Sequence, residues 1–170
     1  MNLKTVNIKY CLFPMITLLL GIIKIFSHDI DTITDYFFTD DTFYYLNTAW
    51  NLKFFNYVTF DGINKTNGLH LLWFWLLALY QNIFSDKITF SYGVLLLCLF
   101  INLFQYRVIY LLSKYLKVDY LYFFVAIFWF HLSLSDTFLS GMDNSIGILI
   151  LSISIYSLFN IFNEEDINKI

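Results

Sequence analysis

Four long apolar runs limit what this chain can fold into. They cover residues 10–27, 88–112, 120–139 and 144–162. A bilayer core about 30 Å thick is crossed by roughly 20 mostly apolar helical residues, so each run has about the length of a membrane span. The composition agrees, because 59% of the 170 residues are hydrophobic and only 14% are charged, whereas about 25% are charged in a soluble domain. The sequence therefore predicts an all-α integral membrane protein.

The composition also excludes several classes of protein. The chain has too few charges and too many large apolar residues to stay disordered. Its net charge is −3, and its ten basic residues form no basic stripe, so nucleic acid is not expected as a partner. Cys11 and Cys98 both lie inside apolar runs, where a free cysteine behaves as a small hydrophobe. We expect neither a disulfide nor a metal site from them.

The basic residues predict the topology. Lys4 and Lys9 precede the first run, and basic residues beside membrane spans prefer the cytoplasm, which places the N-terminus inside. The first run ends without the pair of small residues that a signal peptidase cleaves. We therefore interpret it as an uncleaved signal anchor rather than a signal peptide.

A fifth apolar run, residues 69–84, is only sixteen residues long, and its length leaves open whether it spans the membrane. If it crossed, Arg107, Lys114 and Lys117 would lie outside; if it stays on the outer surface, all three lie inside, as basic residues prefer. We therefore predict four crossings and an interfacial helix over 69–84, with five spans as the alternative.

The outer loop, residues 28–87, is too long for a simple connector. Four of its large apolar residues recur at helical spacing, and these are Phe43, Leu46, Trp50 and Phe54. This spacing predicts an amphipathic helix over 42–55. We expect that helix to lie among the lipid headgroups with its aromatic face in lipid. The chain is thus expected to be a single membrane domain, 1–170, with this loop on its outer face.

Acidic and turn residues make this loop a candidate site. Asp40 and Asp41 stand at the start of the predicted helix. Aspartate is a good N-cap and opposes the helix dipole, so one of the pair needs no further explanation. A pair of adjacent aspartates is more than one N-cap requires. Asp61-Gly62 and Asn67-Gly68 are typical of turns.

Three motifs in order resemble the N-terminal third of bacterial membrane glycosyltransferases of the GT-C superfamily, relatives of the protein O-mannosyltransferases and aminoarabinose transferases. The motifs read DDTFYYLNTAWNL, TFDGINKTNGLHLLWFWLLALY and FLSGMDNSIGILIL. The resemblance covers about residues 8–162. It implies transfer of a sugar from a polyprenyl-phosphate carrier to an acceptor on the outer face of a bacterial inner membrane.

The resemblance also implies roles for particular residues. Asp40 is the favoured base, with Asp41 as a cap or helper, and Asp143 is a second acid that orients the acceptor. The residues implied in substrate binding are Asp61, Lys65, Asn67 and His70. No cofactor or metal-ligand set is predicted, although the acids are compatible with a divalent metal.

This chain departs from the family pattern in two respects. Asp143-Asn144 stands where relatives usually have Glu-Thr, which shortens the acid by one methylene. Such enzymes also run to several hundred residues, so the resemblance implies an incomplete enzyme that needs a missing C-terminal part or a larger polytopic partner. The alternative hypothesis is a non-catalytic membrane subunit or carrier-lipid translocation partner.

Overall fold

The structure is a computed structural model that describes residues 10–167. Over this range every regular element is helical and no strand is present, so the all-α prediction is confirmed there. Lys4 and Lys9, on which the predicted orientation depends, lie outside the described residues.

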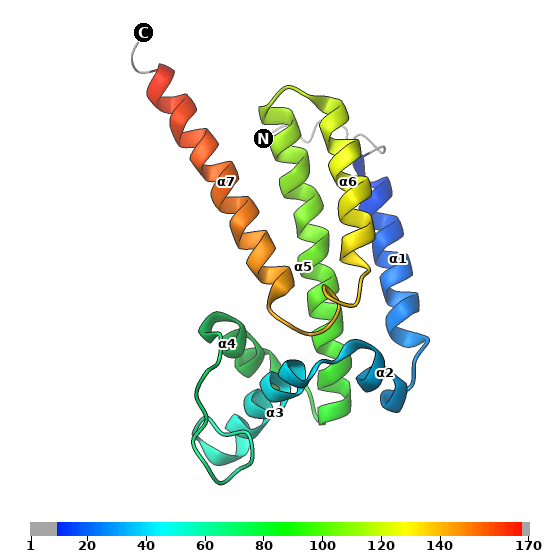
Figure 1. Ribbon diagram of the computed structural model, residues 1–170, viewed down its shortest axis with the longest axis vertical. Coiled ribbons are helices and arrows are strands. Elements are labelled where there is room, and N and C mark those ends of the chain that lie inside the picture. The colour runs from blue at the N-terminus through cyan, green and yellow to red at the C-terminus, as the bar shows by residue number, and fades with distance from the viewer. Residues whose placement is uncertain (1–9, 168–170) are drawn as a thin grey trace.

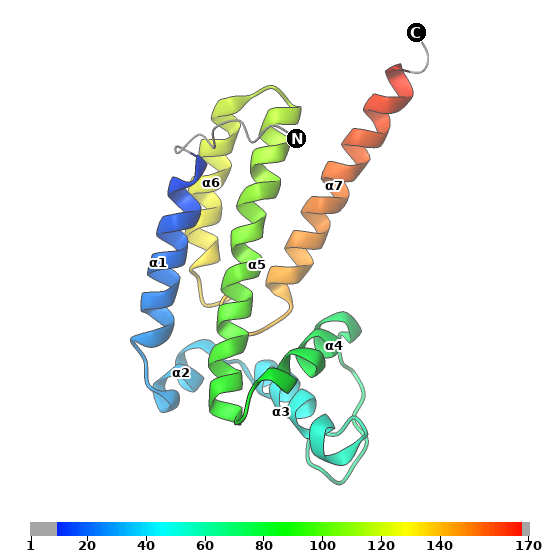
Figure 2. The ribbon, with the colours of Figure 1, turned by 180° about the vertical axis from the view of Figure 1, so that it is seen from behind.

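Four long helices lie side by side (Figure 1). They are α1 (Leu12–Phe26), α5 (Lys87–Tyr115), α6 (Asp119–Ser133) and α7 (Asn144–Ile167). Helix α5 contacts each of the other three, and it is the most buried because it is surrounded. Figure 2 shows from behind that α7 leans away from α5 toward its C-terminal end. We call these four helices the bundle.

Polar side chains join the bundle helices at a few buried points. The hydroxyls of Thr17 and Tyr106 lie 2.7 Å apart and connect α1 to α5. Gln105 Nε2 donates to Ser152 Oγ at 2.6 Å, which connects α5 to α7. Such bonds are favourable between apolar helices because few other partners are available there.

Two of the helices are long and apolar enough to cross a membrane, namely α5 and α7 over Asn144–Ile161. Helices α1 and α6 have 15 residues each, which corresponds to about 22 Å at a rise of 1.5 Å per residue. The chain thus contains helices suited to a membrane.

The predicted helix over 120–139 is too long, because α6 ends at Ser133. Asn102 Nδ2 donates to the carbonyls of Ser133 at 3.3 Å and Phe138 at 3.4 Å. Lys24 Nζ donates to the Leu134 carbonyl at 2.7 Å. These side chains from α5 and α1 satisfy carbonyls at and beyond the end of α6, so the apolar residues after Ser133 fold back as turns instead of continuing the helix.

Three further helices gather at one end of the bundle (Figures 1 and 2). We call them the end layer: α2 (Ile30–Phe37), α3 (Asp40–Phe55) and α4 (Leu71–Tyr80), the last continued by the 3-10 helix η2 (Gln81–Ile83). Helix α3 begins two residues before the predicted helix over 42–55, and α4 with η2 lies within 69–84.

The predicted lipid-facing side of α3 is only partly exposed. Leu46 is buried in the core, and the Trp50 ring stacks on Phe90 of α5 with the ring centroids 5.8 Å apart. Phe43 and Phe54 remain exposed. Helical spacing identified an apolar face correctly, but half of that face packs against the protein because α4 and α5 lie beside it.

Candidate functional site

The N-terminus of α3 is capped by a residue that the sequence analysis did not single out. Thr39 Oγ1 accepts a hydrogen bond from the Thr42 backbone N–H at 3.3 Å. Neither Asp40 nor Asp41 is therefore the N-cap, and both lie in the first turn with exposed side chains. The helix dipole still favours their negative charge, but capping accounts for neither of them.

Both acids line a pocket of about 420 Å³ beside the start of α3. The residues around it are Asp40, Asp41, Tyr44, Tyr45, Asn67, Gly68, His70 and Met142. They come from all three sequence motifs, which are spread over about a hundred residues of the chain. The fold thus brings together two predicted catalytic acids and two of the four residues predicted to bind substrate.

Asp143, the third predicted acid, lies beside the pocket, where it contacts the lining residue His70. Its Oδ2 contacts His70 Nδ1 in a short hydrogen-bonded pair. Two-thirds of the His70 side chain is exposed, against 26% of the Asp143 side chain. The imidazole thus links the turn before α7 to the start of α4, next to Met142, which lines the pocket.

Tyr45 lines the same pocket and is nearly buried. Its hydroxyl accepts a hydrogen bond from the His70 backbone N–H at 2.9 Å. Burial raises the pKa of Tyr45, and the negative charges of Asp143 and Asp41 raise it further. Tyr45 therefore stays a neutral phenol at physiological pH.

Two side chains hold the turn that carries Met142 and Asp143. Thr42 Oγ1 donates to the Ser140 carbonyl at 2.7 Å, and Trp73 Nε1 donates to the Gly141 carbonyl at 3.0 Å. Helices α3 and α4 each contribute one of these anchors. The sequence analysis identified neither, because nothing in the spacing of Thr42 or Trp73 distinguishes an anchor from an ordinary core residue.

A second loop is positioned by Tyr44. Its hydroxyl donates to the Asn67 carbonyl at 2.8 Å, and its ring stacks on Phe60 with the ring centroids 5.4 Å apart. Gly68 follows with a φ of +82°, a conformation that glycine adopts without steric cost. These contacts place the Asn67-Gly68 turn at the edge of the pocket.

Asp61 and Lys65 do not line this pocket. Asp61 Oδ1 accepts from the backbone N–H groups of Ile63 and Asn64, both at 2.8 Å. These hydrogen bonds hold the pKa of Asp61 well below its usual range, which suits an ionised turn residue and not a proton acceptor. Lys65 is exposed in the same loop.

The pocket combines acceptors, a phenol and an imidazole, which together can bind a polar ligand and accept a proton. Within residues 10–167 no group of three or more His, Cys, Asp or Glu side chains is arranged to hold a metal ion. No protein-family model, no curated protein and no solved structure matches this chain.

Proposed function

We propose that this chain is a membrane glycosyltransferase module that transfers a sugar from a polyprenyl-phosphate carrier to an acceptor hydroxyl at the outer face of the membrane. The observation that supports it best is the pocket that gathers Asp40, Asp41, Asn67 and His70 beside Asp143. Each of the three motifs that resemble the GT-C superfamily contributes to it.

In the proposed reaction a carboxylate accepts the proton of the acceptor hydroxyl while the oxygen attacks the anomeric carbon. The bond from that carbon to the carrier phosphate breaks, and the phosphate leaves with the bonding electrons. Asp40 and Asp41 both line the pocket with exposed side chains, so both are candidates for this base. His70, when protonated, is the lining side chain that can carry positive charge toward the leaving phosphate.

Asp41→Asn is expected to lower sugar transfer by about 100-fold to 10,000-fold, the usual contribution of general base catalysis, while the protein still accumulates in membranes. Transfer is measured in membrane vesicles supplied with polyprenyl-phosphate sugars, with the chain in its assembled form. Asp40→Asn tests the alternative base. Asp35→Asn is the matched control, because Asp35 is an exposed acid on α2 outside the pocket. Full transfer by both Asp40→Asn and Asp41→Asn contradicts the proposed mechanism.

We propose a multi-pass arrangement for the chain, in which the four bundle helices cross the bilayer and the end layer lies on its outer side. In a background without Cys11 and Cys98, cysteines placed at Asn64 and Asn144 are expected to react with an impermeant thiol reagent from outside. A cysteine placed at Lys114 should remain unlabelled until the membrane is permeabilised. Labelling of intact cells at Lys114 would instead indicate that 69–84 crosses the membrane.

A non-catalytic membrane subunit is the second candidate function. It is supported by α7, since only 6% of its apolar window is buried against 56% in α5, which leaves much of α7 accessible to helices of another chain. On this hypothesis Asp41→Asn and Asp40→Asn leave the function of the assembled complex unchanged. The transfer assay therefore separates the two candidates.

A further inference from the structure

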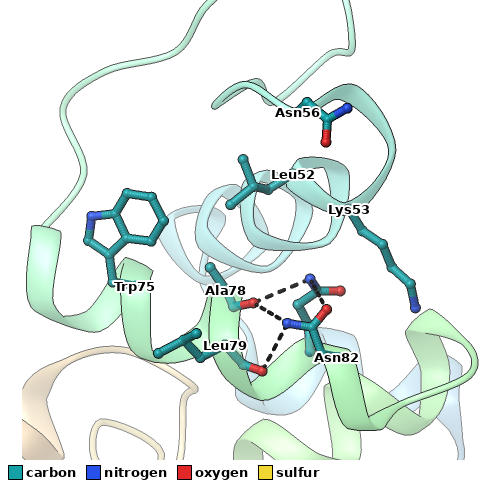
Figure 3. Close-up of a pocket in the computed structure, with 8 residues that line it drawn as sticks. Leu52, Lys53, Asn56, Trp75, Ala78, Leu79 and Asn82 are labelled. Atoms are coloured by element: carbon teal, nitrogen blue, oxygen red, sulfur yellow. Dashed lines mark hydrogen bonds between the residues drawn. The ribbon is translucent and has the colours of Figure 1, made fainter.

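A second pocket, of about 320 Å³, lies between the C-terminal half of α3 and α4. Figure 3 shows Lys53 and Trp75 on opposite sides of it, with Ala78 and Asn82 between them. It shares no lining residue with the pocket around Asp41. The two pockets are therefore separate sites.

Lys53 gives this pocket a positive charge that no neighbouring acid neutralises. None of the eight lining residues is acidic. Within residues 10–167, the contacts of Lys53 Nζ are the Phe84 carbonyl at 3.4 Å and the Trp50 ring, whose centroid lies 5.0 Å away. An exposed ammonium with these weak partners can donate to an anion such as a phosphate.

The opposite side of the pocket is apolar and open. Trp75 and Leu79 of α4 are 51% and 72% exposed, and exposed apolar side chains continue at Leu71 and Leu72 of α4 and at Ile83 of η2. An exposed apolar strip with a polar rim is typical of a surface that meets lipid. Tryptophan in particular is enriched where a membrane meets water.

Gln81 places an unpaired acceptor at the pocket. The residue is only 3% exposed, and its Oε1 atom is buried without a hydrogen-bond partner among the described residues. Its Nε2 atom already donates to the Ala78 carbonyl at 3.3 Å. A buried acceptor without a partner is unfavourable, so a hydroxyl donor supplied by a ligand would be stabilising here.

We propose that this pocket binds the headgroup of an anionic phospholipid that carries hydroxyl groups, as phosphatidylglycerol does. The phosphodiester accepts from Lys53, a headgroup hydroxyl donates to Gln81, and the acyl chains lie along Trp75 and Leu79. The lipid is a resident of the bilayer and is not consumed. This inference depends on the membrane placement proposed above and not on sugar transfer.

Lipid binding is measured by native mass spectrometry of the full chain in detergent, titrated with phosphatidylglycerol, phosphatidylmethanol, phosphatidylcholine or inorganic phosphate. Phosphatidylglycerol is expected to bind most tightly, because phosphatidylmethanol lacks the hydroxyls and phosphatidylcholine lacks the net charge. Lys53→Gln should weaken phosphatidylglycerol binding about fivefold, given about 1 kcal/mol per lysine near a lipid surface and a factor of ten per 1.4 kcal/mol. Lys65→Gln, an exposed lysine outside the pocket, should leave it unchanged.

Trp75→Ala is a second variant. We expect it to weaken the binding of phosphatidylglycerol and of phosphatidylmethanol equally, because it removes a contact with the acyl chains and none with the headgroup. Circular dichroism confirms that each variant is folded. Equal binding by wild type and Lys53→Gln, an equal loss in Lys65→Gln, or displacement of phosphatidylglycerol by an equal concentration of inorganic phosphate would each overturn the proposal. Because no sugar donor is present, the result is independent of the transferase hypothesis, which the Asp41→Asn assay tests separately.

Discussion

Trp73→Ala is expected to lower the free energy of unfolding by about 3–5 kcal/mol, as is usual when a large buried aromatic side chain is truncated. Trp73 is fully buried in the core, and its Nε1 donates to the Gly141 carbonyl. The substitution therefore leaves a cavity beneath α4 and an unpaired buried carbonyl, whose cost adds to the lost apolar contact.

The measurement is the thermal unfolding midpoint of the purified chain in a mild detergent. Trp75→Ala is the matched control, since Trp75 lies on the same helix two residues away and is half exposed. We expect it to change stability by less than about 1 kcal/mol. Trp73→Phe should fall between the two, because it retains part of the ring contact and loses the hydrogen bond. Equal midpoints for Trp73→Ala and Trp75→Ala would show that Trp73 is not an anchor.

Gly141→Ala is expected to lower the free energy of unfolding by about 1–3 kcal/mol, the second largest effect on stability that we predict. Gly141 has a φ of +76°, where an L-residue is strained by roughly 1–2 kcal/mol. An added Cβ would also lie 2.8 Å from Thr42 Cγ2 and 3.3 Å from Val94 Cγ1. Both the backbone strain and the close contacts act on the turn that carries Asp143, so we also expect the pair between Asp143 and His70 to be disturbed.

A double variant separates strain from steric overlap. Thr42→Ser removes Cγ2 but keeps the hydroxyl that donates to the Ser140 carbonyl. When Thr42→Ser is combined with Gly141→Ala, we therefore expect the chain to regain the stability lost to the close contact. The stability lost to backbone strain at residue 141 should not be regained. The coupling energy comes from a double-mutant cycle on unfolding free energies. Strict additivity of the two substitutions would contradict the close contact between Gly141 and Thr42.

Local patterns predicted much of the helical content. Long apolar runs and helical spacing need only a few neighbouring residues to be recognised, and helices do lie over each predicted segment. The pair Asp40 and Asp41 attracted attention for a local reason as well, since two acids at a helix start exceed the need for one cap. Their position in the first turn of α3 agrees with that reading, although Thr39 is the cap.

The end of α6 could not be predicted in this way. The predicted span ran on to residue 139, whereas the residues after Ser133 form turns, and Asn102 and Lys24 from other helices bind the carbonyls of Ser133, Leu134 and Phe138. Helix α3 shows that local patterns are limited in the same way. The spacing of Leu46 and Trp50 predicts an apolar face, but it does not predict which other elements pack on that face. Both outcomes depend on the neighbours that packing supplies.

The sequence by itself determined an all-helical chain, its long apolar segments and the acids at the start of α3, because these properties depend on residues close together in the chain. Only the tertiary structure decided that Asp143 meets His70, that Thr42 and Trp73 anchor the turn before Asp143, and that Asp61 stays outside the pocket. The physical reason is that such contacts join residues tens of positions apart, and their distances are set by how the helices pack.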